Sequence, residues 1–318
     1  MIYIIIPNYN GCKYLRKCIN SILKQSYNCF RIIVIDNNSN DDSYEWLKNY
    51  ENIIFKKLDR NYGFSVAVNE GIKLANSEYI VLLNNDTEVT HDWLKNLVKT
   101  INNDERIFSV SSKMVRYNNK NVIDDAGDDY NLIGWTLKRG DGKNIKRFNK
   151  NKEIFSSCAG AAIYRKCILE KIGYFDERFF AYMEDLDICY RAKINGYKNV
   201  YCSDAVVYHV GSATTGSKYN EFKVKLSARN NIYTIYKNMP LVQLIMNFPF
   251  LLIGFFIKHI FFIVKGFGKS YRSGITEGIK SLHKMKKVDF RFKNLFNYLK
   301  IEVLLIVNVF RYIVSKFI

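Results

Sequence analysis

Short apolar runs that end in polar residues recur through the first half of the chain. The clearest is Tyr79–Leu83, which is followed directly by Asn84, Asn85 and Asp86. A short, continuous apolar run with β-branched members is typical of a strand buried on both faces. The pattern therefore predicts a central strand over 79–83. It places the carboxylate of Asp86 at the carboxyl edge of a sheet, where open α/β folds bind ligands.

The same rhythm of buried strand and amphipathic helix continues on both sides of this stretch. Further strands are predicted over Ile2–Ile6, Arg31–Asp36, Ile53–Phe55, Ile107–Val110, Cys158–Tyr164 and Val206–His209. Strands joined by short helical connections favour a mixed, mostly parallel sheet with helices on both faces. Residues 116–153 are rich in Asn, Asp, Gly and Lys and have no clear period, so we predict an irregular, partly mobile loop there.

Two apolar segments, Leu241–Val264 and Ile301–Ile318, lie in the last quarter of the chain. Asn247 and Pro249 interrupt the first, which falls just short of the roughly 20 apolar residues that a membrane span needs. The second has its apolar residues at helical spacing. We predict an interfacial helical platform, with a small packed helical subdomain as the alternative.

Charge is distributed unevenly along the chain. The net charge is +18, and Lys258–Ile318 carry 13 Lys and Arg against three acids. A basic, aromatic-rich tail fits an anionic membrane surface or a nucleic acid. Because the excess lies in the tail and away from the sheet edge, we expect peripheral membrane contact and no nucleic-acid partner.

Cysteine usage points to a reducing compartment. The seven Cys residues are an odd number without a Cys-x-x-Cys pair, and most lie in apolar patterns, as Cys18 does. They are expected to be reduced thiols and not a disulfide framework or a zinc site. The chain starts directly with a strand pattern, so no signal peptide is expected. These features predict a cytoplasmic protein at the inner face of the cell membrane.

Polar side chains that can carry chemistry occur at predicted strand ends and tight turns. They are Asp36, Asp86, the pair Glu184-Asp185, and His209. Dispersed carboxylates around one sheet edge suit Mg²⁺ or Mn²⁺, which take one or two carboxylates and fill other positions with phosphate oxygens. An imidazole favours Mn²⁺. The chain lacks Gly-x-x-x-x-Gly-Lys and has no Gly-x-Gly-x-x-Gly after its first strand, which removes the main support for P-loop kinases and dinucleotide dehydrogenases.

Seven short motifs, in order and spacing, resemble those of family 2 glycosyltransferases with the GT-A fold, and especially rhamnosyltransferase-like members that build bacterial surface polysaccharides. The motifs are Ile-Ile-Pro-Asn-Tyr-Asn-Gly (5–11), Ile-Val-Ile-Asp-Asn-Asn-Ser (33–39), Asn-Tyr-Gly-Phe (61–64), Leu-Leu-Asn-Asn-Asp-Thr (82–87), Gly-Tyr-Phe-Asp-Glu-Arg-Phe-Phe (173–180), Met-Glu-Asp-Leu-Asp (183–187) and Tyr-His-Val-Gly-Ser (208–212). The resemblance implies a Rossmann-like GT-A domain over 1–235. A helical, basic and apolar segment over 236–318, which we expect to associate with the membrane, follows it.

The resemblance also implies roles for single residues. Nucleotide-sugar binding falls on Pro7, Asn8, Tyr9, Asp36, Arg60, Asn61, Gly63, Asn85 and Asp86. Asp86 would be the metal ligand of an Asp-x-Asp motif whose first Asp is replaced by Asn84. His209 matches a second ligand of Mn²⁺ or Mg²⁺ used in some members. Asp185 matches the general base, and Glu184 would contact the acceptor.

Several residues keep a structural alternative. Asp36 could cap the loop that follows it, and a lone His such as His209 is often structural. Asp187 is interpreted as a structural acid in the turn that starts a helix. Arg229 and Asn230 are further candidates for contact with the diphosphate or the acceptor.

The implied activity is inverting transfer of rhamnose or another hexose. The donor would be a dTDP- or UDP-sugar and the acceptor a hydroxyl of a cell-surface glycan or lipid-linked saccharide. A sugar hydroxyl is a poor nucleophile, so a carboxylate must take its proton, and a divalent metal offsets charge on the diphosphate. One alternative is a polyprenyl-phosphate glycosyltransferase, which would usually have clearer membrane spans. Another is a catalytically silent nucleotide-sugar- or carbohydrate-binding protein, against which Asp86, Asp185 and His209 argue.

Overall fold

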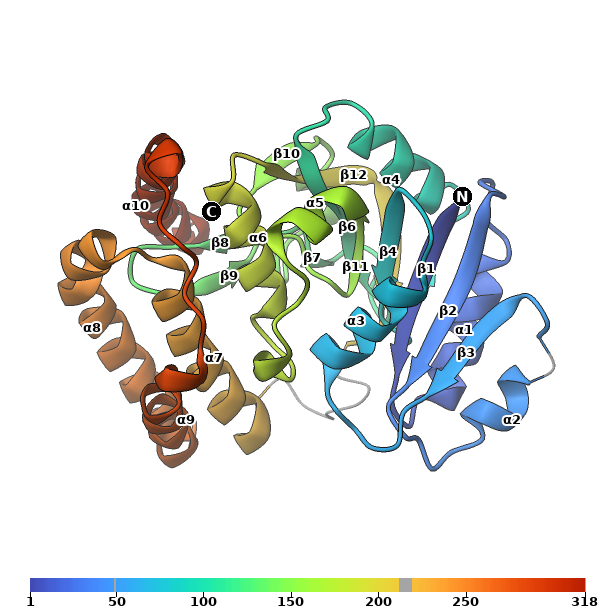
Figure 1. Ribbon diagram of the computed structural model, residues 1–318, viewed down its shortest axis with the longest axis horizontal. Helices are drawn as coiled ribbons and strands as arrows, with labels where there is room; N and C mark the ends of the chain where they lie inside the picture. The colour runs from blue at the N-terminus through green and yellow to red at the C-terminus, as the bar shows by residue number, and fades with distance from the viewer. Residues whose placement is uncertain (49, 212–218, 318) are drawn as a thin grey trace.

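A mixed sheet forms the centre of the molecule. The computed structural model describes residues 1–48, 50–211 and 219–317. Within these residues the sheet has ten strands. Eight follow the order β10-β12-β6-β11-β4-β1-β2-β3, β5 pairs with β12, and β7 pairs with β6 (Figure 1). The strands are β1 (Ile2–Asn8), β2 (Phe30–Asp36), β3 (Ile53–Lys57), β4 (Tyr79–Leu83), β5 (Thr87–Val89), β6 (Ile107–Arg116), β7 (Ile123–Asp125), β10 (Lys152–Ile154), β11 (Ala161–Arg165) and β12 (Lys198–His209).

The longest ladders of the sheet are parallel, which confirms the predicted mixed, mostly parallel arrangement. β1 pairs in parallel with β2 and β4, β2 with β3, and β6 with β12. β11 lies antiparallel between β4 and β6. The register sets Asn8 opposite Asp36, so the carboxyl ends of β1 and β2 meet at one edge.

Helices cover both faces of the sheet. Buried residues of α1 (Cys12–Ile22) and α4 (Trp93–Ile101) pack on one face, and those of α3 (Phe64–Leu74), α5 (Lys166–Ile172) and α6 (Glu184–Ile194) pack on the other. Consecutive residues of β1 alternate between the two cores, with Ile4 in the first and Ile5 in the second. The continuous apolar run of this strand is the sequence signature of burial on both faces.

The prediction of an irregular, partly mobile loop over 116–153 is wrong in large part. This segment contains β7, the hairpin of β8 (Asp128–Tyr130) and β9 (Thr136–Lys138), the short helix η1 (Ile145–Arg147), and the start of β10. Three-residue strands are too short to show a period of two in the sequence. Tertiary contacts order them, since β7 pairs with β6 and β10 with β12.

Three helices that follow the sheet gather at one end of the molecule (Figure 1). They are α8 (Leu241–Val264), α9 (Gly268–Lys280) and α10 (Leu295–Phe317), and α7 (Glu221–Asn238) leads into them. Among the described helices, α8 alone is long and apolar enough to cross a membrane, by length and composition only. The described part of the C-terminal segment, 236–317, is mainly helical, as the sequence predicts. The boundary at 235 stays a prediction, because Tyr130, Tyr190, Leu251 and Leu305 share one core cluster across it.

The remaining short elements are α2 (Ser43–Leu47) and the single turns η2 (Glu177–Phe179), η3 (Leu282–Lys284) and η4 (Phe292–Asn294). All seven Cys residues have free thiols.

Candidate active site

The polar end of β4 is held against the segment that precedes β11. The Asn84 amide N–H donates to the Gly160 carbonyl over 2.8 Å. A Cβ atom at Gly160 would lie 3.0 Å from the Asn84 side chain, so a small residue permits this close approach. The neighbouring Ala159 amide lies 3.3 Å from Oδ2 of Asp185. One short segment thus connects the end of β4, where Asp86 lies, with the predicted base.

Asp86 and His209 face each other, as the resemblance implies. Nε2 of His209 lies 3.3 Å from Oδ1 of Asp86, and both side chains are nearly buried. The other ring nitrogen, Nδ1, lies 2.7 Å from Oδ2 of Asp124. Burial alone would lower the pKa of His209, but its hydrogen bonds with the two carboxylates raise that pKa to about 9.

This donor set fits a divalent cation that shares its coordination with a diphosphate. Neighbouring ligands of an octahedral ion with bonds of 2.0–2.1 Å lie about 3 Å apart, close to the separation of the Asp86 oxygen and the His209 nitrogen. In the described residues no group of three or more His, Cys, Asp or Glu side chains is arranged to hold a metal ion. Protein ligands alone would therefore give a weak site, as expected for a metal that binds together with a nucleotide.

A cationic side chain lies beside the acids next to His209. Nζ of Lys138, at the end of β9, is 3.6 Å from Asp124 and 3.9 Å from Asp125. Burial would raise the pKa of Asp124, but the hydrogen bond from His209 and the charge of Lys138 lower it to about 2. For the fully buried Asp125, burial dominates and raises the pKa to about 6. The site thus contains acids of unequal strength within one polar cluster.

Asp185 occupies the first turn of α6. Its Oδ1 accepts a 2.8 Å hydrogen bond from the Leu186 amide, one of the unpaired donors of the helix start. Burial raises the pKa of Asp185, while the amide hydrogen bonds act in the opposite direction. A carboxylate with a raised pKa is better matched to removing a proton near neutral pH than an ordinary Asp.

Glu184 is a buried acid with an unused oxygen. Its side chain is 6% exposed, and Oε2 has no hydrogen-bond partner in the described part of the chain. Burial, followed by the charge of Asp185, raises the pKa of Glu184 well above its ordinary value. An unpaired buried carboxyl oxygen is costly, so a ligand hydroxyl could complete its hydrogen bonding.

The loop that leads into α6 is strained and braced from α7. Phe180, Tyr182 and Met183 have positive φ angles between 63° and 72°, which cost free energy in residues with side chains. The Asn230 side-chain amide donates to the carbonyls of Phe179, Ala181 and Tyr182 over 2.7–2.8 Å.

Arg229 is engaged in the same way, donating to the carbonyls of Arg178 and Phe179 and pairing with Glu277. These hydrogen bonds give Arg229 and Asn230 a structural role, and contact of either residue with the diphosphate or the acceptor stays a prediction. Both side chains hold the backbone that precedes Asp185, the predicted base.

Three of the predicted nucleotide-binding residues form an internal network. Asn8 donates to Oδ1 of Asp36 over 2.8 Å and accepts from Asn85 over 2.7 Å. Asp36 also accepts from the hydroxyl and the amide of Ser39 at 2.5 and 2.8 Å. The loop-capping alternative for Asp36 is thus present in the structure, and its contact with a base stays a prediction. The network fixes the ends of β1, β2 and β4 relative to one another.

The Arg60–Gly63 turn adjoins the same edge. The Asn37 side chain links to it, donating to the Gly63 carbonyl and accepting from the Tyr62 amide. Asn61 accepts from the Gly63 amide, and Arg60 is exposed with its guanidinium 4.4 Å from the Tyr62 ring centroid. Gly63 is buried, and a Cβ there would lie 2.4 Å from the Phe180 carbonyl. Only glycine at position 63 lets the turn pack against the strained loop that contains Phe180.

Pro7 and Tyr9, the other predicted nucleotide contacts, are half-buried at the end of β1. Ser212, the last residue of the motif that contains His209, lies outside the described residues.

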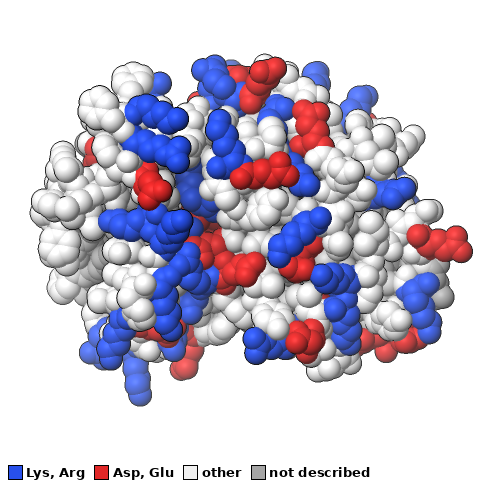
Figure 2. Space-filling model, viewed as in Figure 1, with Lys and Arg blue, Asp and Glu red and all other residues white. Residues whose placement is uncertain are grey.

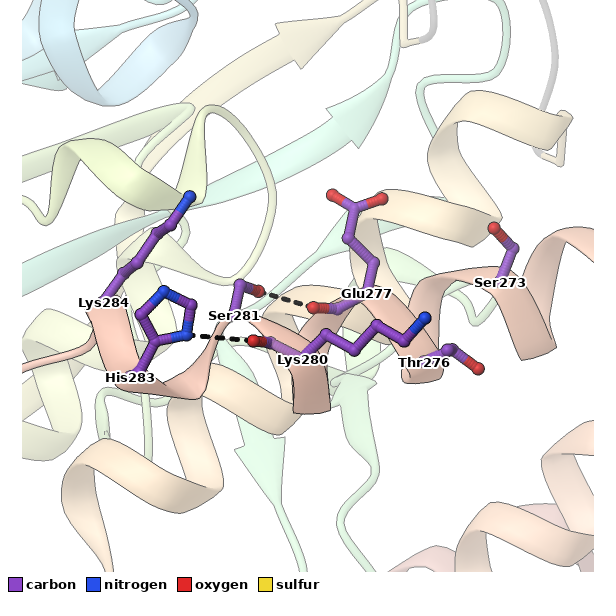
Figure 3. Close-up of a pocket in the computed structure, with 7 residues that line it drawn as sticks. All are labelled: Ser273, Thr276, Glu277, Lys280, Ser281, His283 and Lys284. Atoms are coloured by element: carbon purple, nitrogen blue, oxygen red, sulfur yellow. Dashed lines mark hydrogen bonds between the residues drawn. The ribbon is translucent and has the colours of Figure 1, made fainter.

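A surface pocket of about 500 Å³ lies elsewhere, on α9 and η3 (Figure 3). Its lining includes Lys280, Ser281 and His283. The Ser281 hydroxyl and the His283 ring bond to backbone carbonyls of their own helix end. None of the predicted site residues lines this pocket, so it is not the candidate active site.

Asp124, Asp125 and Lys138 are the site residues that sequence reasoning missed. The run Asp124-Asp125-Ala126-Gly127-Asp128-Asp129 follows the apolar pair Val122-Ile123. This repeats, in shorter form, the apolar-to-acid transition at Asp36 and Asp86. That repetition is the signal that could have revealed them. The composition of the surrounding segment indicates an irregular loop instead.

Comparison with known proteins finds relatives among glycosyltransferases. The chain is 25% identical over 223 residues to the O-antigen chain rhamnosyltransferase WbaN of Salmonella anatum, covering 69% of each chain. It is 33% identical over 103 residues to the glycosyltransferase GlyA of Streptococcus pneumoniae, covering 31% of this chain and 15% of that one. The chain thus spans a small part of some relatives and about two thirds of others.

Solved structures share the fold. The mannosyltransferase PcManGT of Pyrobaculum calidifontis, in complex with GDP-Man and Mn²⁺, aligns with a TM-score of 0.54 at 16% identity, over 87% of this chain and 84% of that one. GalNAc-T7 with UDP, GalNAc and Mn²⁺ aligns with a TM-score of 0.60 at 17% identity, over 74% and 47%. The model of the family described as Glycosyl transferase family 2 matches residues 3–173. The chain therefore belongs to glycosyl transferase family 2 and has the GT-A fold.

Proposed function

We propose that this enzyme moves a hexosyl group, such as rhamnose, from a dTDP- or UDP-sugar to a saccharide hydroxyl with inversion at the anomeric carbon. The acceptor is a growing cell-surface glycan or a lipid-linked saccharide. Asp185 is the general base and Glu184 contacts the acceptor. The similarity to a rhamnosyltransferase of O-antigen chains supports this choice of sugar and acceptor.

The observation that carries the proposal is the connection through Ala159 and Gly160. Gly160 binds the backbone of Asn84 and Ala159 binds the carboxylate of Asp185. A donor diphosphate held at Asp86 would therefore leave the donor sugar beside Asp185. A base on the acceptor side of that sugar is what single displacement needs.

In the reaction, Asp185 accepts the proton of the acceptor hydroxyl as its oxygen attacks the anomeric carbon. The bond between that carbon and the diphosphate oxygen breaks, and the nucleoside diphosphate leaves with the electron pair. Amide donors from Leu186 and Ala159 orient Asp185. The hydroxyl can bond to the unused oxygen of Glu184.

Mn²⁺ or Mg²⁺, held by Asp86 and His209, would supply positive charge against the leaving diphosphate. The Mn²⁺ complexes of GalNAc-T7 and PcManGT support this assignment. His209 presents Nε2 toward Asp86 because Nδ1 is engaged by Asp124.

Transfer to polyprenyl phosphate is the second candidate within the same chemistry. The apolar helix α8 favours it. A polyprenyl phosphate carries its own anionic nucleophile, so this reaction would depend much less on Asp185.

The test is a thermal-shift and turnover screen of the purified chain with dTDP-rhamnose and UDP-hexoses in the presence of Mn²⁺. We expect one donor to raise the melting temperature in a metal-dependent manner. Release of nucleoside diphosphate should then occur on addition of saccharide acceptors. Donor binding without release, with saccharides or polyprenyl phosphate, would contradict the proposal and indicate a silent binding protein.

A further inference from the structure

Helix α8 has an inverted distribution of polar and apolar residues. The stripe that packs inward consists of Gln243, Asn247, Leu251 and Gly254. The outward face is apolar, with side chains 41–79% exposed: Leu241, Val242, Ile245, Met246, Phe248, Phe250, Leu252, Ile253, Phe256, Ile257, Ile260, Phe261, Ile263 and Val264. A helix surrounded by water has the opposite pattern. The medium that covers the outer face of α8 is therefore apolar.

The side-chain amide N–H groups on the inward stripe of α8 donate to other elements of the protein. Gln243 and Asn247 donate to the same oxygen of Glu302, on α10, over 2.6 and 3.0 Å. The carbonyl of Gly254 accepts from the Trp135 indole over 3.0 Å. These contacts hold α8 to the rest of the fold along its inner stripe.

Helix α10 extends the apolar surface. Its outer side chains, such as Phe296, Val303 and Phe310, are 61–66% exposed, whereas Tyr298, Ile301 and Leu305 pack inward. α8 and α10 lie at the same end of the molecule (Figure 1). Figure 2 shows this end as a broad surface with few charged residues. A continuous apolar surface of this kind marks an interaction site.

Cations border this surface. In Figure 2 a band of Lys and Arg side chains lies directly beside the uncharged end. The segment that joins α9 to α10 crosses the same face (Figure 1) and contributes the exposed Lys284, Lys286, Arg291 and Lys293. An apolar face with a basic border is complementary to a bilayer that contains anionic lipids. A second copy of the chain would bring two basic borders together, which opposes self-association.

We propose that α8 and α10 form one membrane face that lies in the plane of an anionic bilayer, with their outer side chains in the boundary between headgroups and acyl chains. The inner stripe of α8 is bound to Glu302 and Trp135, so crossing the bilayer would break those contacts. The helix therefore lies on the membrane and does not span it. The inference goes beyond the proposed reaction and does not depend on it.

Flotation of the full chain with vesicles tests the proposal. We expect the protein to float with vesicles of phosphatidylcholine containing phosphatidylglycerol, and less with phosphatidylcholine alone. The double variant Ile253→Asp/Phe256→Asp should bind at least about tenfold more weakly. The double variant Lys286→Glu/Lys293→Glu should lose the preference for anionic lipid. Neither readout involves turnover.

The matched control is Leu23→Asp/Leu74→Asp, which makes the same charge change at two exposed leucines, one directly after α1 and one at the end of α3. It should float like the parent. Flotation of the Ile253→Asp/Phe256→Asp variant at the parent level would overturn the proposal, as would a parent that never floats. A lipid-free dimer that this variant dissociates would assign the face to a second copy instead.

The depth of α8 in the bilayer is tested separately with the single variant Phe256→Trp, which keeps the membrane face apolar. Lipids brominated near the headgroup should quench its added fluorescence more than lipids brominated at the chain ends. Strongest quenching from the chain ends would place α8 across the bilayer and overturn the in-plane arrangement.

Discussion

Asp124 and His209 are joined by a 2.7 Å contact between a carboxylate oxygen and Nδ1 of the ring. This contact leaves Nε2 as the nitrogen that faces Asp86, 3.3 Å away. Carboxylates in this position fix the orientation of metal-binding histidines and increase their basicity. Asp124 is therefore a positioning residue for the candidate metal ligand, supplied by a strand that sequence patterns did not reveal.

Replacing Asp124 with Asn should weaken Mn²⁺ binding about 10- to 100-fold in the presence of UDP or dTDP. The amide keeps the size of the side chain but loses the negative charge that orients and polarises the ring. Isothermal titration calorimetry measures the change. The matched control is Asp204→Asn, an exposed acid on β12. Parent-like affinity in Asp124→Asn would show that the contact has no influence on the metal.

Metal binding should release a proton from His209. In the metal-free protein its pKa is raised to about 9, against about 6.5 for an ordinary imidazole. The ring is therefore charged at pH 7, and Mn²⁺ must displace that proton. Apparent affinity should rise with pH, by at most about tenfold per unit, and level off near pH 9.

Calorimetry at pH 7 in two buffers of different ionisation enthalpy counts this proton. We expect about one proton per Mn²⁺ bound, and none for His209→Asn. Equal binding enthalpies in the two buffers for the parent protein would remove His209 from the metal site.

Asp86→Ala should reduce nucleoside-diphosphate binding only when Mn²⁺ is present. Asp86 is the proposed carboxylate ligand at the end of β4, whereas the networks around Asn8 and Asn37 are hydrogen bonds within the protein. Titrations with and without Mn²⁺ separate the two contributions. A variant that titrates like the parent under both conditions would exclude Asp86 from the donor site.

Asp185→Asn should lower turnover about 10²- to 10⁴-fold, the usual contribution of a general base. An amide can still accept the hydrogen bond of the Leu186 amide, so the start of α6 should be retained. Nucleotide affinity should change little. Turnover near the parental value with a saccharide acceptor would refute the base assignment, and Asp204→Asn is again the control.

The sheet and part of the site can be predicted from the sequence for one physical reason. Strands such as β1 and β4 are buried on both faces, so their entire length is apolar and their ends are abrupt. Each polar end then falls on one edge of the sheet. For this reason the sequence alone places Asp86 at that edge, together with its counterpart His209.

Helix α7 cannot be predicted from the sequence, because it buries polar residues and not apolar ones alone. Its buried residues include Asn230, Asn231, Thr234, Lys237 and Asn238, which pair with backbone carbonyls and with acids of other elements. A helix that buries polar groups shows no hydrophobic period, so periodicity cannot detect it. Strand β7, which carries Asp124, cannot be predicted either, because three residues are too few to show a period of two.

The buried ion pairs of α7 give a stability prediction. Nζ of Lys237 donates to Asp176 and Asp187 over 2.7 and 2.9 Å, and all three side chains are nearly buried. Lys237→Met would leave two buried carboxylates with less compensation, which costs about 3–5 kcal/mol. Urea unfolding should show this loss, whereas the exposed Lys286→Met should unfold like the parent. Equal stability of the two variants would contradict the role of the cluster.

Gly254 has a practical consequence for any work that shortens the chain. A Cβ atom there would lie 1.9 Å from the Ile133 carbonyl, because the tip of the β8–β9 hairpin is inserted against α8. The same hairpin carries Lys138 into the polar cluster beside His209. Removing residues 241–318 to obtain a soluble catalytic fragment would uncover Tyr130 and Tyr190, and leave the hairpin unsupported. The C-terminal helices are thus part of the enzyme's folding unit, and membrane attachment should be dissected with surface substitutions and not by truncation.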